Sequence, residues 1–196
     1  MGHLLTLVLA SENKNKQKEF EGAFGHSVRV LTLKDVGFDR PLPIESGSTY
    51  EENAKMKAVF VSQELGVPVF ADDSGFEVEA LGGMPGVFSA RFMGGIDSNG
   101  QSQEILRRLN GYSNRRAKFV CILAVCVPGR FETSAFRGEC LGNVSHSLRG
   151  EKGFGYDPIF IPEGFSQTFA EMELEEKWRL SHRGRAAELL KRSILG

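Results

Sequence analysis

The apolar positions at the start of the chain fall into two short runs with a polar stretch between them. Residues 4–10 (LLTLVLA) are apolar almost throughout, as in a strand that is buried on both faces. Residues 27–33 (SVRVLTL) alternate between polar and apolar side chains, which predicts a second strand. The polar residues 11–24 predict a helix that either Ser11 or Asn13 caps. The chain is therefore expected to begin as strand, helix and strand.

The next helix has clear start and stop signals. Thr49 and Glu52 have the spacing of a capping box, and Gly66 is followed by a Val-Pro stop, so residues 49–65 are expected to be helical. The side chains at helical spacing that would form its buried stripe are Tyr50, Ala54, Ala58, Val61 and Leu65. The match of cap, stripe and stop favours a helix packed on a sheet.

Residues 67–71 (VPVFA) predict a short buried strand that ends where two acids begin. This strand would deliver Asp72 and Asp73 to its carboxyl end, which is where open α/β sheets bind ligands. Two adjacent carboxylates repel each other, so a positive group is expected beside at least one of them.

The remaining pattern alternates strands and helices. Residues 76–81 (FEVEAL) predict an edge or half-exposed strand, and residues 119–127 and 131–140 predict two longer strands. Helices are expected at about 102–109 and over 181–195, the last with a buried stripe of Ala186, Leu189, Leu190 and Ile194. No linker or internal repeat interrupts the 196 residues, so we expect a single α/β domain over residues 1–196.

The composition narrows the range of partners. Hydrophobic residues make up 41% and charged residues 25% of the chain, and the net charge is -1, so no overall field attracts nucleic acid or an anionic membrane. The first apolar run is far shorter than the roughly 20 residues that span a bilayer, and it has neither a basic leader nor a cleavage site. We expect a cytoplasmic protein.

Several common site types find no support. The sequence has no GxxxxGK[ST] motif, no GxGxxG after a strand, no HExxH and no GxSxG. The three cysteines are odd in number and lack CxxC spacing, which predicts reduced structural thiols rather than disulfides or zinc ligands: Cys121, Cys126 and Cys140.

Oppositely charged side chains at the ends of elements remain as candidates. Glu45 together with Asp73 would form a hard-oxygen site suited to Mg²⁺ shared with substrate phosphates, and the cation would offset the clustered negative charge. Asn53 and Lys57 are neighbours on one helix face, although a helical lysine can equally be a solvated surface group. Residues 11–16 (SENKNK) could bind phosphate at a helix N-terminus or could be a plain cap.

Two segments near the end of the chain suit a flat heterocycle. Phe154, among glycines, could stack on a base, or its turn could be an ordinary packed loop. Lys177, His182 and Arg183 could face a purine carbonyl or phosphates, or they could be a cap with surface charges. The residue types alone leave both alternatives open.

The order and spacing of these motifs are more specific than any one of them. From residue 6 to about 190, S-x-N-x-x-K (11–16), ESGSTYEENAKMKA (45–58), ADDSGFEVEALGGMPGVFSAR (71–91), GFGYDPIF (153–160) and EKWRLSHRGRA (176–186) together resemble the non-standard purine nucleoside triphosphate pyrophosphatases. The resemblance implies an elongated α/β fold with a mixed central β-sheet flanked by helices, two lobes with an active-site cleft between them, and a homodimer. It also implies Mg²⁺-dependent hydrolysis of ITP, dITP and XTP to the monophosphate and pyrophosphate.

The resemblance also assigns roles by matched position. It implies that Asp73 accepts the proton and binds the metal with Glu45, that Lys57 acts on the phosphates, and that Asp72 is either a second metal contact or a support for Asp73. The residues expected to bind the substrate are Ser11, Glu12, Asn13, Lys14, Asn15, Lys16, Ser74, Phe154, Gly155, Tyr156, Asp157, Lys177, His182 and Arg183. Glu12 and Trp178 depart from the residues usual in the family, which puts only the rim of the pocket in doubt.

Substrate selectivity and two rival functions complete the sequence-based picture. Donors from His182, Arg183 and the 154–157 backbone would recognise a 6-oxo group, and a pocket without an acceptor or room for a 2-amino group would reject guanine. The nearest rival is a related pyrophosphatase that acts on modified pyrimidines or standard nucleotides. A non-catalytic nucleotide-binding module is the other, and the paired carboxylates count against it.

Overall fold

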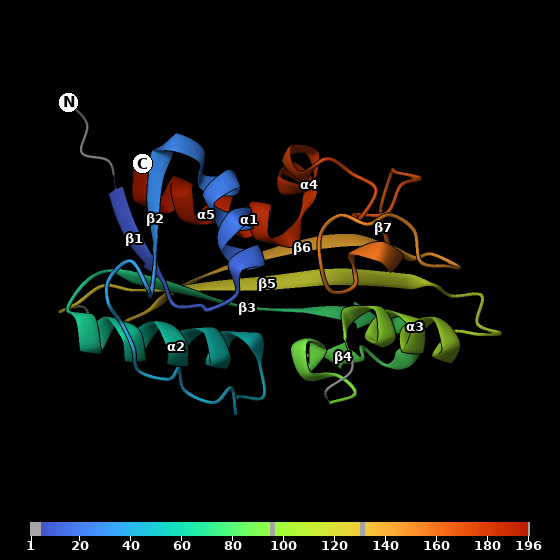
Figure 1. Ribbon diagram of the computed structural model, residues 1–196, viewed down its shortest axis with the longest axis horizontal. Helices are drawn as coiled ribbons and strands as arrows, with labels where there is room; N and C mark the ends of the chain where they lie inside the picture. The colour runs from blue at the N-terminus through green and yellow to red at the C-terminus, as the bar shows by residue number, and fades with distance from the viewer. Residues whose placement is uncertain (1–4, 95–96, 130–131, 196) are drawn as a thin grey trace. The chain divides into compact units, whose positions relative to one another are not determined.

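The computed structural model describes residues 5–94, 97–129 and 132–195, and these form a mixed α/β fold around a seven-stranded sheet (Figure 1). The strand order is β2-β1-β3-β5-β6-β7, with β4 paired to β3. The strands are β1 Leu5–Leu9, β2 Val28–Thr32, β3 Val69–Val78, β4 Pro85–Gly86, β5 Arg116–Cys126, β6 Ser134–Val144 and β7 Phe160–Pro162. The helices are α1 Lys14–Phe24, α2 Tyr50–Leu65, α3 Ser98–Arg108, α4 Leu174–Leu180 and α5 His182–Leu195. The predicted fold class is confirmed.

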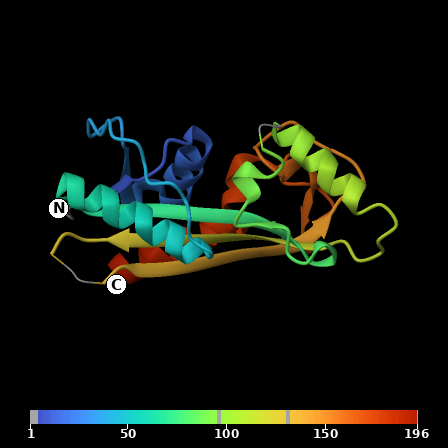
Figure 2. The ribbon, with the colours of Figure 1, turned by 90° about the horizontal axis from the view of Figure 1, so that it is seen from below.

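The chain divides into two compact units. The first unit comprises the described residues of Met1–Asp73, Cys121–Gly138 and Arg183–Gly196, and the second comprises those of Ser74–Val120 and Glu139–His182. In the first unit β1 pairs in parallel with both β2 and β3. Helices α1 and α5 cover one face of these strands and α2 covers the other, which is the nearer face in Figure 2.

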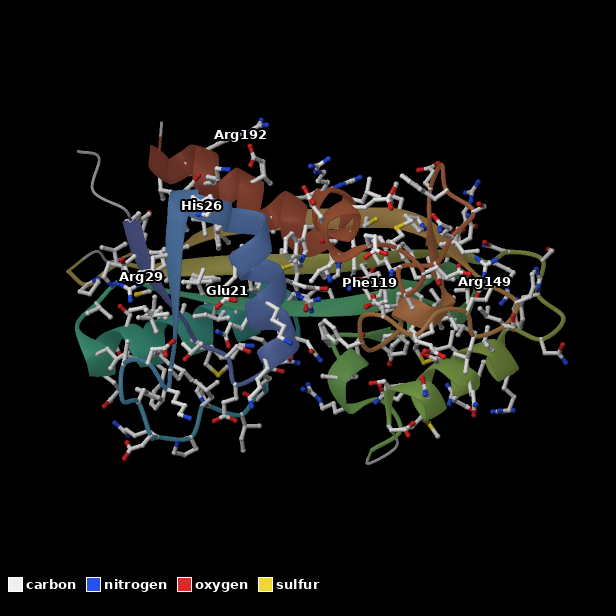
Figure 3. All side chains as sticks on the ribbon, turned by 45° about the horizontal axis from the view of Figure 1, so that its top comes forward. Glu21, His26, Arg29, Phe119, Arg149 and Arg192 are labelled. Carbon is white, nitrogen blue, oxygen red and sulfur yellow. The ribbon has the colours of Figure 1, made fainter. Side chains whose placement is uncertain are left out.

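The core of the first unit is built from the faces that the sequence pattern predicts. Phe70 of β3 meets Phe20 and Phe24 of α1 edge to face, with ring centroids 5.4 and 5.6 Å apart. Charged side chains of α1 and α5, such as Glu21 and Arg192, are exposed and project outward in Figure 3. This separation of apolar and charged faces fixes α1 and α5 on the sheet.

Aromatic packing also dominates the second unit. Phe119, labelled on β5 in Figure 3, contacts the rings of Phe76, Phe160 and Phe169 at centroid distances of 4.9, 4.8 and 5.9 Å. The ring of Phe76 also stacks on Tyr156 at 4.9 Å. These contacts hold the loop that contains Tyr156 against β3 and β5.

Local signals set the helix ends as expected. Asn13, not Ser11, caps α1, since its Oδ1 accepts hydrogen bonds from the backbone N–H groups of Asn15 (2.9 Å) and Lys16 (3.2 Å). The capping box of Thr49 and Glu52 is present at the start of α2. Helix α2 ends at Gly66 in the left-handed conformation (φ 66°), and of its predicted stripe only Leu65 is not fully buried.

The predicted break after residue 71 is wrong. Strand β3 continues through Asp72 and Asp73 for ten residues, so the two acids lie in mid-strand, and 76–81 is not a separate edge strand. The reason is electrostatic, because each carboxylate has a partner on its own face of the sheet and neither needs solvent at a strand end. An acidic pair therefore does not always mark the end of a buried strand.

Other differences are smaller. Helix α3 starts at Ser98, ahead of the predicted 102, because Asp97 Oδ1 accepts a hydrogen bond from the Gly100 N–H (2.8 Å) and caps it. The predicted inner face of α5 is wrong at Leu189 and Ile194, which are exposed. The short elements β4, β7 and α4 were not predicted, and positions 4 and 131 of the predicted strands lie outside the described residues.

All three cysteines are buried and none forms a disulfide, as the sequence predicts. None of the helices in the described ranges has the length and apolar character to cross a bilayer.

Candidate active site

Asp72 forms the centre of a buried charge network in the first unit. Lys16 Nζ lies 2.8 Å and Arg183 Nε 3.6 Å from its Oδ2, and Arg183 also pairs with Glu19 at 2.8 Å. Burial opposes ionisation of Asp72, but Lys16, Arg183 and Lys57 together hold the pKa of this carboxyl well below its usual range. The positive partner that the adjacent acids require is therefore supplied by the chain itself, and Asp72 is a permanent anion.

Asp73 faces a different environment. Its Oδ2 accepts a hydrogen bond of 2.9 Å from Asn53 Nδ2 on α2, and the side chain is nearly buried. Burial raises the pKa of Asp73 to about 6, with a further increase from Glu45, and Lys57 and Asn53 offset only part of it. The two neighbouring acids thus have widely separated pKa values, which is the pattern of a structural anion beside a general base.

Lys57 is a buried site residue rather than a solvated surface lysine. Its Nζ donates to the Asp72 carbonyl oxygen at 2.6 Å and to Glu45 Oε1. Although burial opposes the charge, Asp72 and Glu45 raise the pKa of Lys57, so the ammonium persists at neutral pH. Asn53 and Lys57 are four residues apart, so both lie on the face of α2 that meets Glu45 and the Asp72–Asp73 segment of β3.

The segment 11–16 surrounds the start of α1. Ser11 Oγ accepts a hydrogen bond from the Asn13 N–H (3.2 Å), and Lys16 extends to Asp72. The other positions of this segment, Glu12, Lys14 and Asn15, are exposed. The N-terminus of α1 is capped and carries the exposed Lys14 and the paired Lys16, so it is suited to bind a polyanion.

Glu45 and Asp73 are the candidate metal ligands. Within the described residues, no group of three or more His, Cys, Asp or Glu side chains is placed to hold a metal ion. Glu45 pairs with Lys57, and Glu45 also raises the pKa of Asp73, so a divalent cation there would offset the repulsion between the two carboxylates. Two hard oxygen donors fit Mg²⁺ that is also bound by substrate phosphates.

The second unit carries a separate polar cluster in the loop that follows residue 152. Asp157 Oδ2 accepts hydrogen bonds from Lys177 Nζ (2.6 Å) and from the Phe154 N–H (2.7 Å), and Lys177 and Asp157 are both buried. Lys177 Nζ also lies 5.2 Å from the centre of the Phe154 ring. At Gly153 a Cβ would lie 2.1 Å from Asp157 Oδ2, so the sequence needs glycine to close this loop.

The aromatic residues of that loop have different surroundings. Phe154 and Gly155 are partly exposed, whereas Tyr156 is buried and its hydroxyl donates to the Ser89 carbonyl oxygen at 3.0 Å. Burial raises the pKa of Tyr156 above its usual range. Phe154 therefore lies at the surface of this loop in part, and Tyr156 belongs to the core.

The last predicted site residues are not surface groups. His182 is buried in the second unit and stacks on Phe119, with centroids 4.7 Å apart and planes 10° apart. Arg183 is buried in the first unit between Glu19 and Asp72, and Ser74 is partly buried in β3. The alternative of a cap with surface charges is wrong for both His182 and Arg183.

Sequence reasoning missed two members of the network. Glu19 lies three residues after Lys16 on the inner face of α1, and its pairing with Arg183 joins α1 to α5. Asn53 was noted only for its spacing, although it contacts Asp73 directly. An acid and an amide among apolar positions on a helix face are the signals that could have found them.

The fold and the buried cluster define an α/β protein with paired acids and lysines beside one strand of its sheet. The model of the Ham1 family matches residues 7–193, and this chain belongs to that family. It is 46% identical over 186 residues to a dITP/XTP pyrophosphatase from Deinococcus deserti, covering 94% of this chain and 86% of the relative. It is 43% identical over 187 residues to a dITP/XTP pyrophosphatase from Flavobacterium psychrophilum, covering 95% and 97%.

Solved structures show the same fold. The chain resembles the Staphylococcus aureus Ham1 protein with a TM-score of 0.86 at 37% identity, covering 97% of this chain and 98% of that one. It resembles a HAM1 protein from Coxiella burnetii with a TM-score of 0.87 at 34% identity and the same coverage. The similarity extends over nearly the whole of each chain.

Proposed function

We propose that this protein hydrolyses non-standard purine nucleoside triphosphates (ITP, dITP and XTP) to the monophosphate and pyrophosphate, and so removes them from the nucleotide pool. One observation carries the proposal: the nearly buried Asp73 carboxylate accepts a hydrogen bond from Asn53 Nδ2 at 2.9 Å, and the buried Lys57 ammonium donates to the carbonyl oxygen of the preceding Asp72 at 2.6 Å. The names of the curated relatives, dITP/XTP pyrophosphatase, support the choice of substrate.

The reaction needs a base and neutralisation of phosphate charge. Asp73 accepts the proton of the attacking water, since a carboxylate with a pKa near 6 is mostly ionised at pH 7 and basic enough to assist. Lys57 and Lys16, together with the start of α1, bind the phosphates and neutralise charge as it develops. Glu45 and Asp73 would hold Mg²⁺, which when bound neutralises phosphate charge.

Residues of the second unit recognise the base. Phe154, which is partly exposed, stacks on the purine, and Lys177 keeps the 153–157 loop closed through Asp157. Selectivity rests on His182 and Arg183 as donors to the 6-oxo group.

Two organisational features belong to the same proposal. We propose that the protein acts in the cytoplasm and, on the basis of the family resemblance alone, that it is a homodimer. Light scattering coupled to gel filtration measures the mass, and a value of one chain would refute the dimer.

A nucleotide panel tests the function. Purified protein is given ITP, XTP, dITP, dTTP and GTP, with Mg²⁺ or with EDTA, and pyrophosphate and orthophosphate are measured separately. We expect pyrophosphate from ITP, XTP and dITP only when Mg²⁺ is present. Faster hydrolysis of dTTP or GTP would favour the related pyrophosphatase, and ITP binding without any product would favour the non-catalytic module.

A further inference from the structure

Asn53 lies fully buried in the first turn of α2 and makes hydrogen bonds in two directions. Its Oδ1 accepts from the Gly47 N–H at 2.8 Å, and its Nδ2 donates to Asp73 Oδ2 at 2.9 Å. Since the Gly47 N–H can only donate, the amide oxygen must face Gly47, and the NH₂ group must face Asp73. Asn53 therefore joins the loop that carries Glu45 to the strand that carries the proposed base.

The loop has little freedom at this contact. A Cβ on Gly47 would lie 2.7 Å from Asn53 Oδ1 and 2.8 Å from Glu52 Cβ, so the backbone of the loop packs directly on α2. The next two N–H groups, of Ser48 and Thr49, donate to Glu52 Oε2 at 2.7 and 3.2 Å. Three successive backbone donors are thus held by two adjacent side chains of α2.

We propose that Asn53 is a positioning residue for hydrolysis. By donating to Oδ2 it fixes the direction of the Asp73 carboxylate, and by accepting from Gly47 it sets the distance between that carboxylate and the loop of Glu45. This inference rests on the proposed function, in which Asp73 is the base and shares the metal with Glu45. Such alignment matters because a displacement of about 1 Å at a reacting group can cost about 100-fold in rate.

Three variants separate positioning from simple helix capping. Asn53→Ala removes both hydrogen bonds, and Asn53→Asp keeps an acceptor for Gly47 but loses the amide donor to Asp73. Glu52→Ala is the matched control, because it removes the capping box while both hydrogen bonds of Asn53 remain. All three alter the first turn of α2 and are expected to lower stability.

Steady-state hydrolysis of ITP with Mg²⁺ gives the first readout. We expect kcat to fall about 100-fold in Asn53→Ala and at least as far in Asn53→Asp, with KM changed less than about 3-fold in both. In Glu52→Ala we expect kcat to stay within about 3-fold of wild type. A loss of kcat in Asn53→Ala no larger than in Glu52→Ala would overturn the proposal.

Two further readouts use the metal-free, nucleotide-free protein. The Gly47 amide should exchange with solvent faster in Asn53→Ala but remain protected in Asn53→Asp, and crystal structures of both variants should show the Asp73 carboxylate turned from its wild-type direction. If the wild-type protein fails to hydrolyse ITP, that result by itself refutes the proposed function, whatever the variants do. The positioning claim is then decided by the crystals, and an unmoved Asp73 carboxylate in Asn53→Ala would overturn it.

Discussion

The raised pKa of Asp73 predicts that removing its charge stabilises the folded protein. The folded state holds this proton up to a pH of about 6, whereas an unfolded aspartate releases it near the ordinary value of 3.8. Ionising Asp73 in the native state therefore costs free energy at neutral pH. Asp73→Asn has nearly the same shape, can still accept the hydrogen bond from Asn53, and never ionises.

The size of the effect follows from the shift. A difference of about 2 pKa units corresponds to about 3 kcal/mol at 1.36 kcal/mol per unit. Because the pKa is raised on folding, the penalty is absent below about pH 4, grows between about pH 4 and 6, and is complete above that range. Asp73→Asn should thus be more stable than wild type by about 3 kcal/mol at pH 8 and by less than about 1 kcal/mol at pH 4.

Urea unfolding of both proteins in EDTA, from pH 4 to pH 8, measures this difference. Thermal unfolding at pH 8 should show a rise in Tm of roughly 6 to 12 °C for a chain of this length. Hydrolysis of ITP by the same variant should fall about 10²- to 10⁴-fold, as expected when a general base is lost. A pH-independent difference in stability, or a variant less stable than wild type at pH 8, would refute the assignment of a raised pKa to Asp73.

Three further predictions concern the other groups of the site. Lys57→Met should lower kcat/KM for ITP by about 10²- to 10³-fold, because a preorganised cation is lost from the phosphates, and near-normal kinetics would exclude that role. Phe154→Ala should weaken ITP and XTP binding equally, by about 1–3 kcal/mol in a titration with nucleotide, since stacking does not depend on the identity of the base. Glu19→Ala should destabilise the fold by about 3 kcal/mol in urea because it leaves the buried Arg183 without its nearest carboxylate, and adding Arg183→Met should restore most of the loss.

Much of the fold could be predicted because its signals are local. The cap, stripe and terminal glycine of α2 depend on residues within one or two turns, and the structure confirms the cap, the end and nearly all of the stripe. The course of β3 could not be predicted, because Asp72 and Asp73 are accommodated in mid-strand by contacts with Lys16, Arg183 and Asn53, which are distant in sequence. A pattern along the chain does not reveal such partners.

The same contrast between local signals and partners distant in sequence applies to the candidate site. The acids, lysines and aromatic ring near 72–73 and 152–157 could be named as candidates from the sequence, but their residue types left alternatives open, and their roles came from the resemblance. The different states of Asp72 and Asp73 were not visible, because they depend on burial and on which face of the strand each side chain occupies. The roles assigned by resemblance to Ser74, His182 and the other nucleotide-binding residues remain predictions.

Adjacent positions on a strand face opposite directions, and this has a consequence for how the sequence around β3 can change. The loss or gain of one residue just before Asp72 would reverse the faces that the two side chains occupy. The Asp72 carboxylate would then point toward α2, and the Asp73 carboxylate toward α1 and α5. Compensatory substitutions would then be needed at once in α2 and in the helices α1 and α5 on the opposite face. Insertions and deletions should consequently be far more damaging in this strand than conservative replacements of its apolar side chains.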